Sequence, residues 1–228
     1  MRFLVIYTSF LSVFCFSQEK YKMIVEISDN NSIDIIGTGN FFSGTNFSVG
    51  TQIDTKKSSF NLSGIYQFGG NWWGAPPYYM KYHLLGIKLK YRVLNIERRV
   101  SPFFEITGLT EVGTNYRDSY ISYSWRPTTY ASEFSNLSYS SRFYAGTPFV
   151  GNLLLGCDIR LVHGLHLNIS AGYGLRVMLT RYAIWSKGYM LSKEQIHERS
   201  VSTKNLHMLD FQLGLSYAFS FKKKTKNI

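Results

Sequence analysis

The 228-residue sequence has few charged residues, few prolines and almost no cysteine. Charged residues make up 17% of the chain, whereas about 25% is usual in soluble domains. No apolar run reaches the roughly 18 residues of a membrane-spanning helix, which excludes a helical membrane bundle. What the sequence does have is aromatic residues, 17 tyrosines and 17 phenylalanines, and together with only 5 prolines they favour β-structure.

The N-terminal segment predicts export. Arg2 gives a positive start, residues 3–16 are almost wholly apolar, and the small Ser17 precedes polar residues. This is the layout of a secretory signal peptide, and we expect residues 1–17 to be removed by cleavage after Ser17. An uncleaved anchor is the first alternative. A lipoprotein acylated at Cys15 is the second, although Phe14 occupies the place where a small residue is required.

Acidic residues are scarce, and the 14 Asp and Glu against 25 Lys and Arg give a net charge of +11. Such a balance suits a nucleic acid or an anionic membrane surface. Export argues against nucleic acid as a partner. Part of the surplus lies in residues 222–228, which contain four lysines and are interpreted as a solvated C-terminal tail. Loss of Cys15 would leave Cys157 alone, so no disulfide framework is expected.

Alternation of apolar with small or polar residues is the strongest pattern. Over residues 209–221 every odd position is large and apolar, and the even positions carry residues such as Asp210, Gln212 and Gly214. A period of two over this length predicts a strand. Similar segments bring the set to eight predicted strands, at 21–28, 46–54, 60–68, 85–93, 103–112, 149–161, 165–179 and 209–221. Residues 33–42 are an alternative for the first strand.

The connections between these segments alternate between long and short. The predicted long ones are 29–45, 69–83, 113–148 and 181–206, and the short ones are 55–59, 94–102 and 162–164. Outer-membrane barrels have short periplasmic turns and long external loops. Residues 18–221 are therefore predicted to form an all-β, eight-stranded, antiparallel, up-and-down transmembrane β-barrel in the cell outer membrane, with both termini on the periplasmic side.

The chain resembles the small eight-stranded outer-membrane barrels of the OmpA/OmpX-like group. The local resemblance lies in Gln212, Gly214, Tyr217 and Phe219, which are similar to the C-terminal signal of such proteins. The resemblance implies recognition by the barrel-assembly machinery and a setting of lipid bilayer and lipopolysaccharide. The family signal usually ends the chain, whereas here a basic tail follows Phe219. The cleavage zone and the aromatic loops are reminiscent of barrels from Bacteroidetes.

The inward positions of the predicted strands collect charges of both signs, with Lys22 and Glu26 among them. We expect them to form a lumenal network of Lys88, Lys90, Arg92, Glu105, Glu111, Asp158, Arg160, Arg176 and Asp210. Across the 94–102 turn, Lys90 and Arg92 come within cross-strand reach of Glu105. An eight-stranded barrel is just wide enough for side chains to fill it. The network is interpreted as a plug, and a narrow ion path is the alternative.

No catalytic constellation stands out. His166 and Ser170 share an inward strand face, but a rise of about 3.3 Å per residue places them about 13 Å apart, too far for a nucleophile and its base. His163 and His166 point to opposite faces, which argues against a shared metal ion. We expect no catalysis, no metal and no cofactor.

Aromatic residues outside the predicted strands suggest a contact surface. Trp72, Trp73, Tyr120, Tyr123 and Trp125 could instead belong to the interfacial girdle of a barrel. Exposed Tyr and Trp among Ser and Asn also suit contacts with a glycan or a protein. The predicted role is structural, anchoring or adhesin-like surface binding. A small passive pore or transporter for ions or small solutes is the alternative, and a soluble lipocalin-type barrel is the third.

Overall fold

The computed structural model describes residues 20–36, 41–55, 57–72, 79–94, 99–125, 138–186 and 191–220. The predicted signal peptide at 1–17, the basic tail at 222–228 and Trp73 lie outside the described residues. No helix in the described part of the chain is long and apolar enough to cross a membrane.

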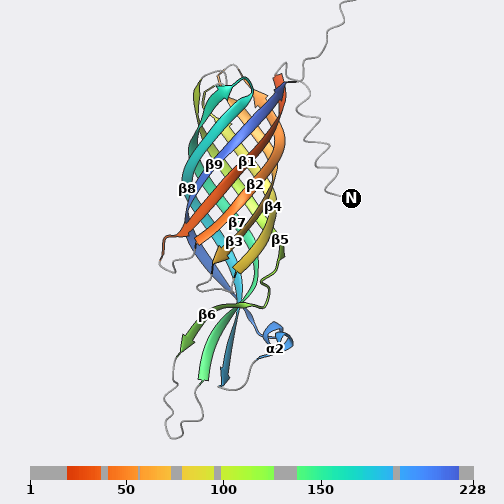
Figure 1. The fold of residues 1–228 in the computed structure, drawn as a ribbon, viewed down its shortest axis with the longest axis vertical. Coiled ribbons are helices and arrows are strands. Elements are labelled where there is room, and N and C mark those ends of the chain that lie inside the picture. Colours follow the sequence, from red (N-terminus) through yellow and green to blue (C-terminus); the bar gives the residue numbers. More distant parts are fainter. Residues whose placement is uncertain are drawn as a thin grey trace, which may run out of the picture.

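The chain forms an eight-stranded antiparallel barrel, as the alternation predicts (Figure 1). Its sheet runs in the order β5-β4-β3-β2-β1-β9-β8-β7, and pairing between β5 and β7 closes the cylinder. The barrel strands are β1 (Lys20–Asp34), β2 (Phe41–Asp54), β3 (Ser59–Trp72), β4 (Tyr79–Arg92), β5 (Val100–Thr114), β7 (Ser138–Val162), β8 (Leu165–Ser186) and β9 (Val201–Ser220). Closure pairs the backbone groups that an open sheet would leave free at its edges.

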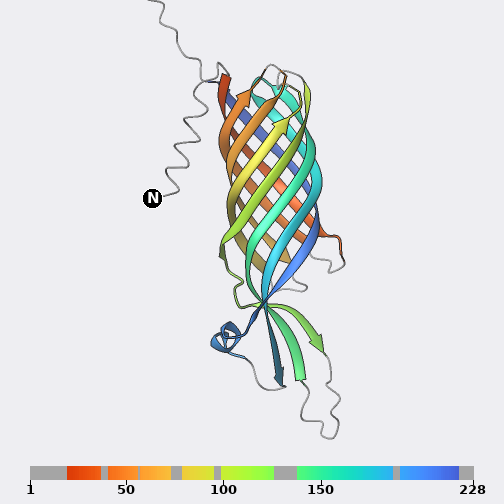
Figure 2. The same ribbon diagram turned by 180° about the vertical axis from the view of Figure 1, so that it is seen from behind.

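The two ends of the barrel differ. The start of β1, the end of β9 and the connections β2–β3, β4–β5 and β7–β8 lie at one end, which we call the turn end (upper in Figure 1). The β7–β8 connection is only His163 and Gly164, and Gly164 adopts φ +82°, a conformation that suits glycine. At the other end β7, β8 and β9 continue beyond the barrel wall into an extension (Figure 2).

The extension also contains β6 (Tyr120–Trp125) and the short helix α2 (Lys193–His197). β6 pairs with the first residues of β7 and is the ninth strand of the sheet, beyond the eight strands that the β5–β7 pairing closes into the barrel. Ser192 caps α2 by accepting from the Gln195 amide, and the Gln195 side chain accepts in return from the Ser192 amide.

The polarity of the barrel is the reverse of that of a soluble protein. On β9 the outward residues Leu209 and Leu213 are 41% and 56% exposed, whereas the inward Asp210 and Ser216 are each 1% exposed. The same alternation of exposed apolar and buried polar side chains occurs over residues 25–28 of β1 and 46–49 of β2. The polar face therefore lines the lumen, and the apolar face covers the outside.

The strands are longer than the sequence pattern predicts. Of the predicted first loop, 29–45, residues up to Asp34 belong to β1 and residues from Phe41 belong to β2. Much of 69–83, 113–148 and 181–206 is likewise strand, so the strict alternation of long and short loops is wrong. Residues 29–32 are all polar and so lack the alternation of apolar and polar residues. They still pair with both neighbouring strands, β2 and β9. Of the two alternatives for the first strand, 21–28 is the one that forms a single strand.

Candidate functional site

The lumen near the turn end is filled by a network of ion pairs. Lys88, Lys90 and Arg92 occupy successive inward positions of β4 and are almost fully buried. Lys88 Nζ lies 2.7 Å from Glu26 Oε1 of β1, and Lys90 Nζ lies 3.1 Å from Asp158 Oδ1 of β7. Strands β2 and β3 separate β4 from β1 in the sheet, so Lys88 reaches Glu26 across the lumen.

Additional contacts tie the network together. Lys90 Nζ also approaches Glu26 Oε2 at 3.5 Å and Glu105 Oε2 at 3.9 Å. The Arg92 Nε donates to Asp158, and its Nη1 donates to Gln52 Oε1 at 2.9 Å. The Lys90–Glu105 pair is directly opposite in the β4–β5 ladder, which confirms the predicted register.

The network is balanced in formal charge. Among these described residues Lys88, Lys90 and Arg92 meet the carboxylates of Glu26, Glu105 and Asp158. Neutral amides complete the coordination: Asn168 Nδ2 donates to Asp158 Oδ1 at 2.8 Å, and Gln212 Nε2 donates to Glu26 Oε1 at 3.4 Å. Buried charges are tolerated when they are paired and hydrogen-bonded, as Glu26 and Asp158 are. Glu105 has only the 3.9 Å contact with Lys90, and neither of its oxygens accepts a hydrogen bond in the described part of the chain.

A second layer, composed of packed apolar residues, lies in the lumen toward the extension. Twelve buried residues form one cluster, composed of Phe42, Ile65, Met80, Tyr82, Leu84, Leu109, Tyr116, Tyr144, Val150, Met178, Leu206 and Met208. This layer is absent from the sequence prediction because the predicted strand 85–93 begins after Met80, Tyr82 and Leu84. Met80, Tyr82 and Leu84 have the same alternation as Lys88 and face the lumen with it. Their pattern in the sequence could have indicated an apolar layer. Ion pairs and packed apolar side chains together occupy the interior.

Four residues expected in the lumenal network stand apart from it. Arg160 is exposed, because it lies beside the β7–β8 turn at the mouth of the barrel. Glu111 accepts from Tyr144 Oη near the extension, and Arg117 approaches it at 3.7 Å. The Arg176 guanidinium lies 3.9 Å from the Phe42 ring centroid and 4.7 Å from that of Tyr82, within the apolar layer.

Asp210, the fourth, is buried against Gly174 of β8. A Cβ built at Gly174 would lie 2.3 Å from Asp210 Oδ2. The carboxylate therefore occupies the space that a side chain at position 174 would fill. The predicted single network is therefore wrong in extent. Five of its nine residues, Lys88, Lys90, Arg92, Glu105 and Asp158, come together, and Glu26, an inward residue of the predicted strand 21–28, joins them.

The predicted assembly signal lies in β9, the strand that pairs with β1 in the closed barrel. Gln212 and Gly214 face the lumen, and a Cβ at Gly214 would lie 2.4 Å from Ser28 Cβ. Tyr217 and Phe219 face outward with ring centroids 4.6 Å apart in an edge-to-face arrangement. Their recognition by assembly machinery stays a prediction.

The base of the extension is held by charged and polar contacts. Arg181 of β8 is buried and donates from Nη1 to Asp118 Oδ1 at 2.6 Å, and His197 Nδ1 of α2 lies 3.4 Å from Asp118 Oδ2. The Asp118 amide donates to the Tyr144 carbonyl at 2.7 Å, and the Tyr144 amide donates to the Ser119 carbonyl at 2.8 Å. These contacts join the β5–β6 connection to β7, β8 and α2.

The predicted aromatic contact residues are distributed over this extension and the neighbouring strand end. Tyr120 begins β6 and packs edge-to-face against Phe143, with ring centroids 6.3 Å apart. Tyr123 and Trp125 lie in β6 as well, so their assignment to a loop is wrong. Trp72 ends β3.

Arg181→Ala should loosen the base of the extension, because it leaves Asp118 without its buried cation. We expect faster limited proteolysis within residues 191–200, by severalfold, with the barrel core still protected. Arg117→Ala is the matched control, since this arginine is 61% exposed and contacts Glu111 only at 3.7 Å. Equal cleavage of both variants would contradict the assigned role of Arg181.

Metal-binding groups do not gather in the described residues. No group of three or more His, Cys, Asp or Glu side chains in that part of the chain could hold a metal ion. His166 is buried in the lumen, and among the described atoms neither ring nitrogen has a hydrogen-bond partner. The expected lack of catalysis stays a prediction.

Comparison with known proteins gives similarity in fold only. No protein-family model matches the chain, and no curated protein matches it in sequence. Neisserial surface protein A is 11% identical with a TM-score of 0.42, covering 87% of this chain and 97% of that one. A major outer membrane protein from Thermus thermophilus is 14% identical with a TM-score of 0.37, covering 87% and 99%.

A third solved structure, the translocator domain of autotransporter NalP from Neisseria meningitidis, is 10% identical with a TM-score of 0.22, covering 93% of each chain. With sequence identities and TM-scores this low, these similarities do not indicate a function. The resemblance to OmpA/OmpX-like and Bacteroidetes barrels therefore stays a prediction at the level of family.

Proposed function

We propose that the chain is an integral outer-membrane β-barrel with a closed lumen, which anchors its extension for surface binding. The observation that carries the proposal is the inverted polarity of the wall. Large apolar side chains such as Ile87 (59% exposed), Leu155 (67%) and Leu213 (56%) point outward on three different strands. Water would oppose this exposure, whereas lipid hydrocarbon accommodates it. The same polarity argues against a soluble lipocalin-type barrel.

The barrel strands have a suitable length for a bilayer. A tilted transmembrane strand needs about 9–11 residues, and the shortest barrel strands have 14. Closure through β5–β7 satisfies the requirement that no sheet edge faces lipid. With the turn end on the periplasmic side, the extension projects from the cell surface.

A closed lumen favours anchoring over transport. Lys88 bridges to Glu26 from the opposite wall, and Lys90 contacts three carboxylates. Moving a solute along this axis would require several buried ion pairs to separate, and the apolar layer adds a second barrier. The pore alternative is thus the less favoured function.

Extraction tests the membrane assignment. We expect the full chain to stay with the membrane pellet in alkaline carbonate and in high salt, and to dissolve only in detergent. The control is a periplasmic soluble protein in the same preparation, which should appear in the wash. Release of the barrel by carbonate without detergent would contradict an integral location.

Surface binding is tested with the intact barrel in lipid nanodiscs on glycan and protein arrays. The proposal expects ligand signals that fall at least tenfold in the Tyr120→Ser, Tyr123→Ser and Trp125→Ser triple variant, because aromatic anchors dominate such interfaces. Tyr91→Ser, on the outer face of β4, is the control and should keep the signal. Equal signals for both variants would contradict a binding role for β6.

A further inference from the structure

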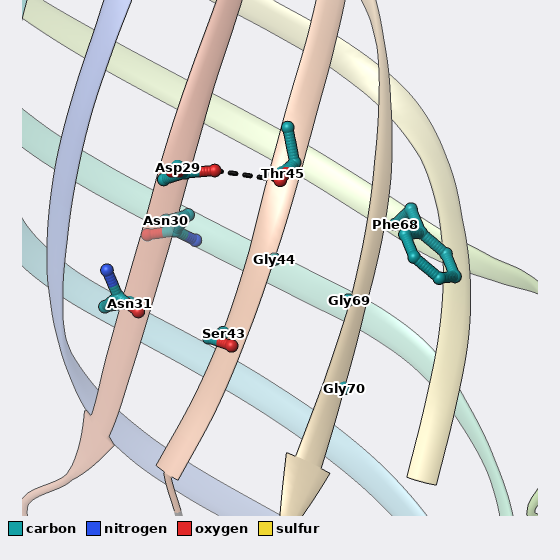
Figure 3. Close-up of a pocket in the computed structure, with 9 residues that line it drawn as sticks. All are labelled: Asp29, Asn30, Asn31, Ser43, Gly44, Thr45, Phe68, Gly69 and Gly70. Atoms are coloured by element: carbon teal, nitrogen blue, oxygen red, sulfur yellow. Dashed lines mark hydrogen bonds between the residues drawn. The ribbon is translucent and has the colours of Figure 1, made fainter.

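A polar hollow interrupts the apolar outer surface of the barrel on β1, β2 and β3 (Figure 3). We call it the outer groove. Its volume is about 300 Å³, and its lining contains no lysine or arginine. Two cross-strand rows of outward residues line it: Asp29, Thr45 and Phe68 form one, and Asn31, Ser43 and Gly70 form the next.

Apolar residues flank these rows on both sides along the strands. Toward the turn end the next outward row is Ile27, Phe47 and Tyr66, and toward the extension end it begins with Ile33 and Phe41. Ile27 and Phe47 are 46% and 48% exposed. On the β9 side, the apolar Leu213 pairs with Asp29 and the apolar Phe211 pairs with Asn31. The outer groove is therefore a polar interruption between two apolar rows of the outer surface.

Small residues create the hollow. Ser43 and Gly70 are cross-strand partners with little or no side chain, and the Phe68 ring turns away from them toward β4, where its centroid lies 5.1 Å from that of His83 (Figure 3). The backbones approach closely at Gly69, where a Cβ would lie 2.3 Å from the Ser43 carbonyl oxygen. At the β1 side, Thr45 Oγ1 donates to Asp29 Oδ1 at 2.8 Å, as Figure 3 shows. This bond orients the carboxylate, and no donor in the described part of the chain contacts its second oxygen.

The position of Asp29 along β1 places the outer groove at a boundary of the membrane, provided that the barrel lies in the outer membrane as proposed. Asp29 is nine residues from Lys20, the start of β1 at the turn end. At about 3.3 Å per residue and a tilt near 40°, this is about 23 Å along the barrel axis, close to the roughly 25 Å height of an apolar band. The outer groove would thus face the headgroups of the external leaflet.

The chemistry of the lining suits a sugar. A carboxylate, an amide and hydroxyl groups offer both acceptors and donors to the hydroxyl groups of a sugar, and the Phe68 side chain adds an apolar edge on the β3 side. The Asp29 charge, with no cation in the lining, disfavours a phosphate. Because apolar Ile27 and Phe47 adjoin the groove on the membrane side, an acyl chain attached to the sugar can lie along the barrel.

We propose that the outer groove binds the uncharged sugar headgroup of a glycolipid in the surrounding leaflet. A free sugar would fill the hollow but would leave the adjoining apolar row uncovered. A glycolipid occupies the hollow and also covers the apolar row. Its headgroup pairs with Asp29, Asn31 and Thr45, and its acyl chain covers the adjoining row that begins with Ile27.

Native mass spectrometry of the full chain tests the proposal. The barrel is reconstituted in phosphatidylcholine nanodiscs with equal amounts of monoglucosyl diacylglycerol and phosphatidylglycerol of matched acyl chains, then released from the disc. We expect retention of the glucosyl lipid in preference to phosphatidylglycerol. Asp29→Leu and Thr45→Val should each weaken that preference about tenfold, the effect of losing one or two hydrogen bonds.

Thr51→Val is the matched control, because Thr51 also faces outward on β2 but lies outside the outer groove. It should retain the glucosyl lipid as the unaltered chain does. Equal retention of both lipids, or an equal loss in Thr51→Val, would overturn the proposal. Displacement of the lipid by an equal concentration of methyl glucoside would overturn the lipid source and identify a free saccharide as ligand.

Vesicle flotation of the same preparations separates this proposal from the proposed function. A barrel that floats with vesicles but shows no preference for the glucosyl lipid overturns the glycolipid site alone. A barrel that does not associate with vesicles overturns the outer-membrane location, and the glycolipid site with it.

Discussion

Glu26→Ala is expected to lower the free energy of unfolding of the barrel by about 3–5 kcal/mol, the cost of breaking a buried ion pair by removing one partner. Glu26 is 3% exposed and accepts from Lys88 at 2.7 Å. Its loss leaves the Lys88 ammonium buried without a close carboxylate and takes one of three anions from Lys90. Reversible urea unfolding in phospholipid vesicles, followed by tryptophan fluorescence, measures the change.

Two further variants distinguish the effect of an unpaired buried charge from the effect of lost packing. Glu26→Leu combined with Lys88→Met removes the pair and should cost much less than Glu26→Ala, since paired apolar replacements are often neutral. Glu105→Ala should also lower stability but by less, because the nearest cation in the described lumen is Lys90 at 3.9 Å. If Glu26→Ala unfolds at the same urea concentration as the unaltered chain, the cross-lumen pair does not stabilise the barrel.

Tyr82→Ala is the second large effect, expected at about 3–5 kcal/mol for truncating a large aromatic core residue. Tyr82 is fully buried in the apolar layer, with Phe42 at a centroid distance of 6.3 Å and the Arg176 guanidinium over its ring. Truncation opens a cavity and removes one face of the cation–π contact. The same urea unfolding experiment measures it.

Tyr82→Phe provides the control for the hydroxyl group. The Tyr82 Oη donates to the Ser43 carbonyl at 3.2 Å, so the phenylalanine variant should lose only about 0.5–1.5 kcal/mol. Equal costs for the two variants would mean that the hydrogen bond, and not the packed ring, stabilises this layer.

Local alternation was sufficient to predict the barrel because every wall residue faces either lumen or exterior. The odd residues from Leu209 to Phe219 are all exposed and the intervening ones mostly buried, as the sequence pattern indicates. Strand ends were predicted less well. Residues such as Asn30 and Ser32 are polar and buried in the lumen, and polar residues in a barrel strand resemble those of a loop.

Contacts within one hairpin could be predicted, whereas contacts across the lumen could not. The short connection between β4 and β5 fixes the register that places Lys90 opposite Glu105. The 2.7 Å pair between Lys88 and Glu26 depends on the stagger of the whole closed sheet. The separation of Arg176 from the ion pairs has the same origin, because depth along the lumen is a property of all eight strands together.

Single-channel recording in planar lipid bilayers tests the closed, anchoring barrel most directly. The unaltered full chain, inserted from detergent at neutral pH in concentrated KCl, is expected to give no stable conductance steps, because ion pairs and the apolar layer fill the lumen. A porin inserted under the same conditions verifies that the bilayers report open channels. Reproducible unitary steps from the purified barrel would contradict the closed lumen and favour a pore.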